Sequence, residues 1–121
     1  MLCETFINDN NADLCAIPGY TFLESHRHNK SRGGVAIYVN NKFTFKLRKD
    51  LDIFDECFFE SKFIELTSTK KHVIVGEIYR IPNTNEKEFI DKYSQILQKV
   101  SDENKDIIFG MDQNLDFLKF A

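Results

Sequence analysis

Residues 106–116 read Asp-Ile-Ile-Phe-Gly-Met-Asp-Gln-Asn-Leu-Asp, a short apolar run followed by a polar segment. The length and β-branched character of residues 107–109 predict a buried strand, which Gly110 ends. Asp112 and Asn114 follow two residues apart, and in an extended segment such residues point to the same side. The strand would therefore present a carboxylate and a carboxamide together at the carboxyl edge of a sheet, where open α/β sheets usually bind ligands.

Two interpretations of this pair are open on the residues alone. A carboxylate that aligns or deprotonates a water, beside an amide that donates to an oxyanion, suits chemistry on a phosphate. Gly, Asp and Asn are also common turn residues, so the same letters fit a strand that ends in a polar turn. Taken alone, the stretch favours the plain turn.

The composition indicates a folded and mildly acidic chain. With 121 residues it is at most one domain, and a hydrophobic content of 42% with 12 Phe argues against disorder. The formal net charge of -3 gives no overall attraction to nucleic acid, so any such binding needs a local basic patch. Cys3, Cys15 and Cys57 are widely spaced, which predicts reduced packing residues rather than a disulfide framework or a zinc site.

The sequence shows no membrane or export signal. No apolar run is long enough to span a bilayer, and the first residues do not form a basic-then-apolar signal peptide. We therefore expect no membrane partner and an intracellular protein, nuclear or cytoplasmic, that is not secreted.

Hydrophobic patterns predict most of the secondary structure. Asn85 predicts a helix cap with Glu88 three residues on, and a stripe of apolar residues at helical spacing follows it. Because a helix then separates two strands, a parallel strand–helix–strand unit is expected. The predicted strands start near Phe22 and cover residues 35–39, 43–47 (as a hairpin partner of 35–39), 59–66, 72–79 and 107–109. Residues 51–58 are predicted to be a loop, and residues 8–13 a loop or the start of a short helix.

Several segments, in order, carry a family resemblance. They read GGVAIYV at 33–39, ESKFIEL at 60–66, YRIPN at 79–83 and GMDQNLDFLK at 110–119, with an Ile-x-Gly-Tyr segment at 17–20 and a Glu-Thr pair at 4–5. These segments resemble domains of the endonuclease/exonuclease/phosphatase superfamily, and most closely the apurinic-type endonuclease domain of non-LTR (LINE-like) retrotransposons. Met111 separates a Gly and an Asp that are usually adjacent in the family, and Gln113 replaces a usual aromatic or aliphatic residue.

The resemblance implies an α/β (α+β) fold that is part of a four-layer α/β/β/α sandwich, with a mixed sheet, hairpins and one crossover helix. It predicts that residues 1–121 form a single partial domain without the family's N-terminal and C-terminal strands. The segment with the family's catalytic His would be among the missing parts, and none of His26, His28 or His72 matches it. We therefore expect this chain to be inactive by itself.

The resemblance also implies the site residues. Asp112, Asn114 and Tyr79 would be catalytic, and Glu4 would bind Mg (Mn possible), a hard cation that prefers carboxylate oxygens. Tyr79 would contact the phosphate, and Arg80 could pair with it. The structural alternatives are a core aromatic at Tyr79 and an exposed Glu4 near a frayed terminus.

One basic cluster spans residues 26–34. Its members Arg27, Lys30 and Arg32 could contact a phosphate of the nucleic-acid backbone, or could simply keep a loop solvated. His26 and His28 have no third metal ligand nearby, which argues against zinc.

Three functions follow from these observations. The first is a fragment of a Mg-dependent endonuclease that hydrolyses DNA phosphodiester bonds, as in target nicking by a retrotransposon. The second is a catalytically dead relic that acts as an interaction or nucleic-acid-binding module, with sheet edges that allow a homo-oligomer. The third is a phosphoesterase of another branch of the superfamily, which the segments at 33–39 and 79–83 disfavour.

Overall fold

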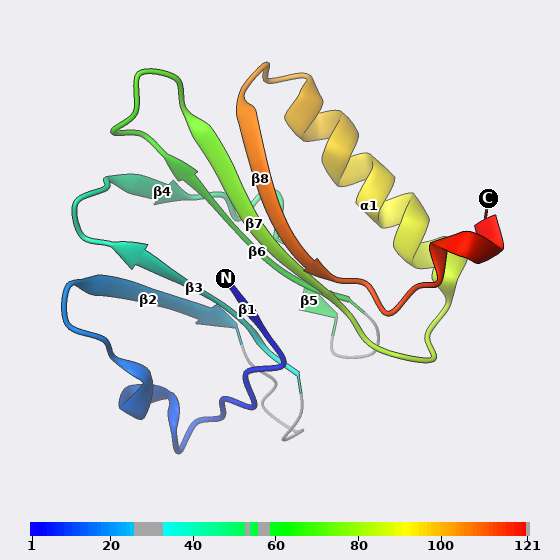
Figure 1. Cartoon of the computed structure of the whole chain (residues 1–121), viewed down its shortest axis with the longest axis horizontal. Helices are drawn as coiled ribbons and strands as arrows, with labels where there is room; N and C mark the ends of the chain where they lie inside the picture. The colour runs from blue at the N-terminus through cyan, green and yellow to red at the C-terminus, as the bar shows by residue number, and fades with distance from the viewer. Residues whose placement is uncertain (26–32, 53, 56–58, 121) are drawn as a thin grey trace.

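The computed structural model describes residues 1–25, 33–52, 54–55 and 59–120, and shows two β-sheets packed face to face (Figure 1). The first, sheet A, is antiparallel and has the strand order β1-β3-β2. Its strands are β1 (Leu2–Cys3), β2 (Tyr20–Ser25) and β3 (Val35–Asn40). A short 3-10 helix, η1 (Ala12–Cys15), precedes β2.

The second sheet, sheet B, is mixed and has the order β4-β6-β7-β8, with β5 also paired to β6. Helix α1 links the parallel strands β7 and β8 and lies on the face of sheet B that points away from sheet A (Figure 1). The elements are β4 (Phe45–Leu47), β5 (Phe54–Asp55), β6 (Phe59–Leu66), β7 (Val73–Arg80), α1 (Glu86–Ser101), β8 (Asp106–Asp112) and η2 (Phe117–Phe120).

Strand β7 is buried on both faces, as its apolar sequence predicts. Ile74 and Ile78 point to α1 and join the larger core cluster, which includes Phe59 and Phe63 of β6. Val75 points the other way and packs on the smaller cluster between the two sheets. The two faces of β7 therefore pack against different layers.

Helix α1 begins as the sequence predicts. The Asn85 side chain accepts a hydrogen bond from the Glu88 backbone N–H at 3.1 Å, which satisfies a donor that the first turn leaves unpaired. Phe89, Ile96 and Val100 of the predicted apolar stripe are buried on sheet B. The helix thus packs through one face and carries β8 back parallel to β7.

The segment after β3 differs from the prediction. Residues 43–47 were predicted as the hairpin partner of β3, but β4 pairs with β6. Both edges of β3 are already occupied, by β1 and β2, and Phe45 packs on the apolar cluster between the sheets. The short strand β5 lies within the segment 51–58 that was predicted to be a loop.

The predicted fold class is confirmed at the level of a mixed α and β sandwich. The described residues form three layers in the order sheet A, sheet B and α1. Cys3 and Cys15 are free cysteines, while Cys57 lies outside the described residues. Over the described part of the chain, no helix is long and apolar enough to cross a membrane.

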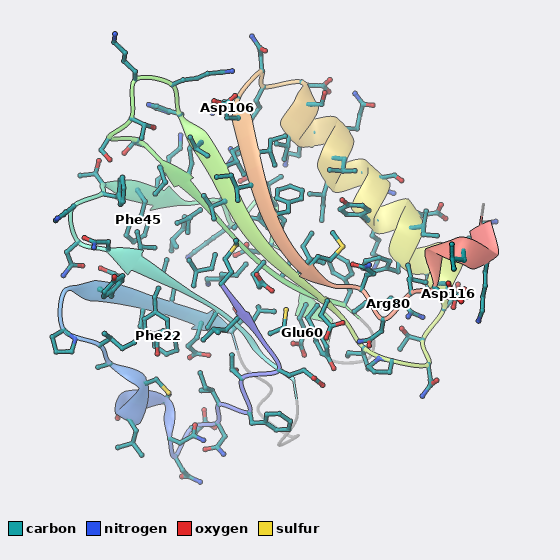
Figure 2. All side chains as sticks on the ribbon, in the orientation of Figure 1. Phe22, Phe45, Glu60, Arg80, Asp106 and Asp116 are labelled. Carbon is teal, nitrogen blue, oxygen red and sulfur yellow. The ribbon has the colours of Figure 1, made fainter. Side chains whose placement is uncertain are left out.

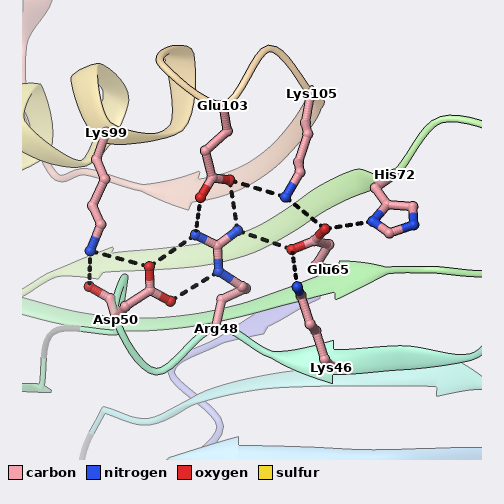
Figure 3. A network of polar contacts seen from close by, with 8 residues as sticks. All are labelled: Lys46, Arg48, Asp50, Glu65, His72, Lys99, Glu103 and Lys105. Carbon is pink, nitrogen blue, oxygen red and sulfur yellow. Dashed lines mark hydrogen bonds and ion pairs between the residues drawn. The ribbon is translucent and has the colours of Figure 1, made fainter.

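A network of charged side chains fastens the α1–β8 connection to sheet B (Figure 3). Its centre is the fully buried Glu65 of β6, which accepts a hydrogen bond from Arg48 Nη1 at 3.1 Å. Lys105 Nζ lies 2.8 Å from the other Glu65 oxygen, and Arg48 also donates to Glu103 at 2.6 Å. The remaining members are Lys46, Asp50, His72 and Lys99.

The charge of Glu65 depends on its partners. Burial opposes its ionisation, but hydrogen bonds from Lys105, His72 and Lys46 outweigh burial and lower its pKa from 4.5 to about 2. A carboxylate whose pKa is lower in the folded than in the unfolded state stabilises the fold above the unfolded value. This contribution is lost as the pH falls from about 4.5 through about 2.

We predict that Glu65→Gln lowers the free energy of unfolding by about 2 kcal/mol at pH 7, because several cations lose their shared buried partner. It should also make the loss of stability between about pH 4.5 and about pH 2 shallower. Urea unfolding across this pH range measures both effects, with Asp91→Asn on the exposed face of α1 as the control. Unchanged stability and an unchanged acid profile in Glu65→Gln would contradict this role.

Candidate functional site

The candidate site lies where β7 and β8 end. Tyr79 and Asp112 are register partners on these parallel strands, so their side chains leave sheet B on the same face, toward sheet A. On β6, Glu60 is the register partner of Tyr79 and points the same way. Three polar side chains therefore form a row across sheet B. Tyr79 and Asp112 were predicted, whereas Glu60 was not.

Glu4 reaches this row from sheet A. The Tyr79 hydroxyl donates a hydrogen bond to Glu4 Oε1 at 2.8 Å. Tyr79 is buried while Glu4 is exposed, so the carboxylate lies at the solvent side of the phenol. The backbone of Glu4 has a φ of 49°, in the left-handed region that non-glycine residues seldom adopt. Such backbone strain concentrates at functional sites.

Asn114 lies just beyond the row, in the turn after β8. Its backbone also lies in the left-handed region, with a φ of 45°. Its side-chain Nδ2 donates to the carbonyl of Arg80 at 2.8 Å. The structure thus brings Glu4, Tyr79 and Asp112 together and holds Asn114 beside the residue that follows Tyr79.

Arg80 points to the opposite face of sheet B, toward α1 (Figure 2). It is 2% exposed, and its Nη1 donates to the carbonyl of Asn114 at 2.7 Å. Its Nη2 donates to the carbonyl of Thr84, and its guanidinium lies 6.0 Å from the centre of the Phe89 ring. These contacts fasten the turns after β7 and β8, and they give no support to the predicted contact of Arg80 with a phosphate.

Two buried carboxyl groups, one in the row and one next to it, were not predicted as site residues. Glu60 is fully buried and accepts a hydrogen bond from the Gly34 N–H at 2.7 Å. Glu77 is 4% exposed and lies two residues before Tyr79 on β7. The sequence offered one signal for Glu77, a glutamate within a mostly apolar strand, two residues before Tyr79 and so on the same face. Its position near Asp112 was not predictable, because it depends on the register of β7 and β8.

The basic cluster supplied the other predicted nucleic-acid contacts. Arg27, Lys30 and Arg32 lie outside the described residues. His72 contacts Glu65 in the charged network, at the opposite end of β7 from Tyr79.

The metal preference of the site can be judged from its donors. Among the described residues there is no group of three or more His, Cys, Asp or Glu side chains placed to hold a metal ion. Mg²⁺, however, commonly takes one or two carboxylates and completes its shell with water and substrate phosphate. An exposed carboxylate at Glu4, beside a phenol and a second carboxylate, fits that kind of sparse site.

The fold has a solved counterpart. No protein-family model and no curated protein sequence matches the chain. Among solved structures, the chain is similar to the endonuclease domain of TRAS1, a telomere-specific non-LTR retrotransposon, with a TM-score of 0.63 and 14% identity. The similarity covers 83% of this chain and 43% of that domain, so the chain spans less than half of it. This similarity shows that the fold is of the kind found in a retrotransposon endonuclease domain.

Arg80 provides a test of the local geometry. We predict that Arg80→Lys lowers the free energy of unfolding by about 2 kcal/mol, because a lysine cannot reproduce the forked donation to two carbonyls inside the protein. Thermal unfolding measures the loss, and Lys87→Arg on the exposed surface of α1 is the control. A variant that keeps its stability and loses only affinity for DNA would restore the phosphate-contact interpretation.

Proposed function

We propose that this chain carries part of a site that hydrolyses phosphodiester bonds in DNA with the help of Mg²⁺. The observation that supports this proposal best is the convergence of three side chains from different elements. Glu4 follows β1, Tyr79 is on β7 and Asp112 is on β8. They meet at one end of a fold similar to that of a retrotransposon endonuclease domain.

Each of these side chains suits one task in hydrolysis. The half-buried Asp112 carboxylate can accept a proton from an attacking water or align it. The Tyr79 hydroxyl, which donates to Glu4 without substrate, can donate to a phosphate oxygen instead. The Asn114 amide nitrogen carries two hydrogens, and its bond to the Arg80 carbonyl leaves one for an oxyanion.

The metal ion would be held by Glu4. When bound, Mg²⁺ (or Mn²⁺) supplies positive charge that polarises the scissile phosphate. Before substrate binds, the hydrogen bond from Tyr79 fixes one oxygen of the Glu4 carboxylate and directs the group toward the row on sheet B.

A second candidate function is an interaction module, and the edge of sheet B favours it. Strand β8 is the last strand in the order of sheet B, and Ile108 on it is 54% exposed. An edge strand with exposed apolar side chains can pair with another chain, including a second copy of this one. Sedimentation of the purified chain at rising concentration tests this alternative.

The binding part of the proposal is tested by NMR. We predict that Mg²⁺ together with a short DNA duplex shifts the backbone amide signals of Glu4, Tyr79 and Asp112, and that Asp112→Ala weakens the effect. Low salt favours the measurement, because phosphate contacts weaken as salt rises. Asp91→Asn, far from the site on α1, is the control. Shifts confined to other surfaces, or no shifts at low salt, would contradict the proposal.

The catalytic part is tested by nicking of supercoiled plasmid. We predict no Mg²⁺-dependent nicking by this chain above the background of Asp112→Ala, because the resemblance implies a catalytic His that none of His26, His28 or His72 matches, and a site without one of its groups loses orders of magnitude in rate. EDTA provides the metal-free control. Nicking that requires Mg²⁺ and disappears in Asp112→Ala would show instead that Glu4, Tyr79, Asp112 and Asn114 suffice.

A further inference from the structure

Glu60 connects the two sheets at the end of the sandwich that carries the candidate site (Figure 2). Its side chain is fully buried and lies beside that of Tyr79, its register partner on β7. The carboxyl group accepts a hydrogen bond from the backbone N–H of Gly34 at 2.7 Å. Gly34 directly precedes β3, so this bond joins β6 of sheet B to the start of the central strand of sheet A.

Gly34 in turn contacts the backbone that follows β1. The Thr5 N–H donates to the Gly34 carbonyl at 3.4 Å, and the Phe6 N–H donates to the Gly33 carbonyl at 3.0 Å. The fit is close, because a Cβ atom added to Gly34 would overlap Thr5 Oγ1. Gly34 also has a φ of 95°, in a region that favours glycine. Both its backbone conformation and its lack of a side chain therefore suit direct contact with Thr5.

The backbone around Glu4 needs such support. Glu4 and Phe6 have φ values of 49° and 54°, in the left-handed region, although neither is a glycine. Residues strained in this way persist only where the surrounding structure holds them. The pairing of β1 with β3 ends at Cys3, before Glu4 is reached. The hydrogen bonds to the carbonyls of residues 33–34 therefore continue the hold on this segment beyond the strand.

We propose that Glu60 is a positioning residue that holds Glu4 in front of Tyr79 through Gly34. The two neighbours on sheet B act on Glu4 at different points. Tyr79 donates to the Glu4 side chain, whereas Glu60 fixes Gly34, which fixes the backbone just after Glu4. A carboxylate held at both points needs less ordering when a ligand binds. The task of Glu4 rests on the proposed function, but the connection from Glu60 to Glu4 does not.

The connection is tested by amide hydrogen exchange, followed by NMR, in Glu60→Leu and Glu60→Gln. Leucine has a similar volume and no acceptor, so the exchange rates of Gly34 and residues 5–6 should rise at least tenfold more than that of Ile78 in the core. Glutamine keeps one acceptor oxygen, so the same rates should rise together by less than tenfold beyond Ile78. Glu65→Gln, at the other end of β6, is the matched control and should raise them no more than it raises the rate of Ile78.

A faster exchange confined to Gly34, with residues 5–6 as protected as in the unchanged protein, would overturn the proposal. If Glu60→Leu does not fold, Glu60→Gln decides the question in the same way. Its side chain has one acceptor oxygen in place of two, so the rates of Gly34 and residues 5–6 should still rise together.

The consequence for the site is tested by the response of the Glu4 and Tyr79 amide signals to Mg²⁺ with a short DNA duplex. Glu60→Leu should weaken the apparent affinity at least tenfold, and Glu60→Gln by less than threefold. Folded Glu60→Gln protein that keeps its amide protection but loses the response would overturn the proposal, because Glu60 would then bind the ligand itself. Absence of a response in the unchanged protein would contradict the proposed function, and hydrogen exchange would still decide the positioning role.

Discussion

The parallel register of β7 and β8 is the constraint on which the candidate site depends. Because Tyr79 is paired with Asp112, two residues that are far apart in the sequence leave the sheet side by side. A slip of one residue would turn Asp112 toward α1 and into the apolar core. The register is itself fixed by that core, since Ile78 on β7 and Phe109 and Met111 on β8 pack beneath α1. Packing on one face of sheet B therefore positions the polar groups on the other.

The charged groups at the two ends of the sandwich differ in how they are paired. At one end, the Glu65 network joins β4, β6 and the α1–β8 connection. Each carboxylate in this network is paired with at least one positively charged side chain. At the other end, Glu60, Glu77 and Asp112 lie on one face of sheet B, and Glu4 faces them from sheet A. Among the described residues, Glu77 Oε2 is buried and has no hydrogen-bond partner. Side chains paired with opposite charges stabilise a fold, whereas several neighbouring carboxyl groups favour the binding of a cation or a proton. We propose that the cation binds at Glu4.

Local patterns in the sequence were sufficient to predict β3, β6, β7 and α1, because each has a clear apolar period or cap. Residues 107–109 were predicted as a buried strand that Gly110 ends, but β8 runs on to Asp112 and lies at the edge of sheet B, with Ile108 54% exposed. The pairing of β4 with β6 was not predictable in this way, since alternation shows that a strand exists but not which neighbour it joins. The same limit applies to the site. Tyr79 and Asp112 were predicted as site residues from the ends of strands and the family resemblance. The position of Glu77 near the site was not predictable, because it depends on the register that places it beside Gly110 and Cys3. The buried position of Arg80 likewise depends on the turns that wrap it.

The central proposal is that a cation binds at Glu4, beside Tyr79 and Asp112. Mn²⁺ occupies the same oxygen-rich sites as Mg²⁺ and broadens NMR signals near it, so substoichiometric Mn²⁺ on ¹⁵N-labelled protein tests the claim directly. We expect selective broadening of the amide signals of Glu4, Tyr79 and Asp112, with those of Asp50 and Glu103 at the charged network unaffected. Broadening centred on the network, or spread evenly over the surface, would contradict it.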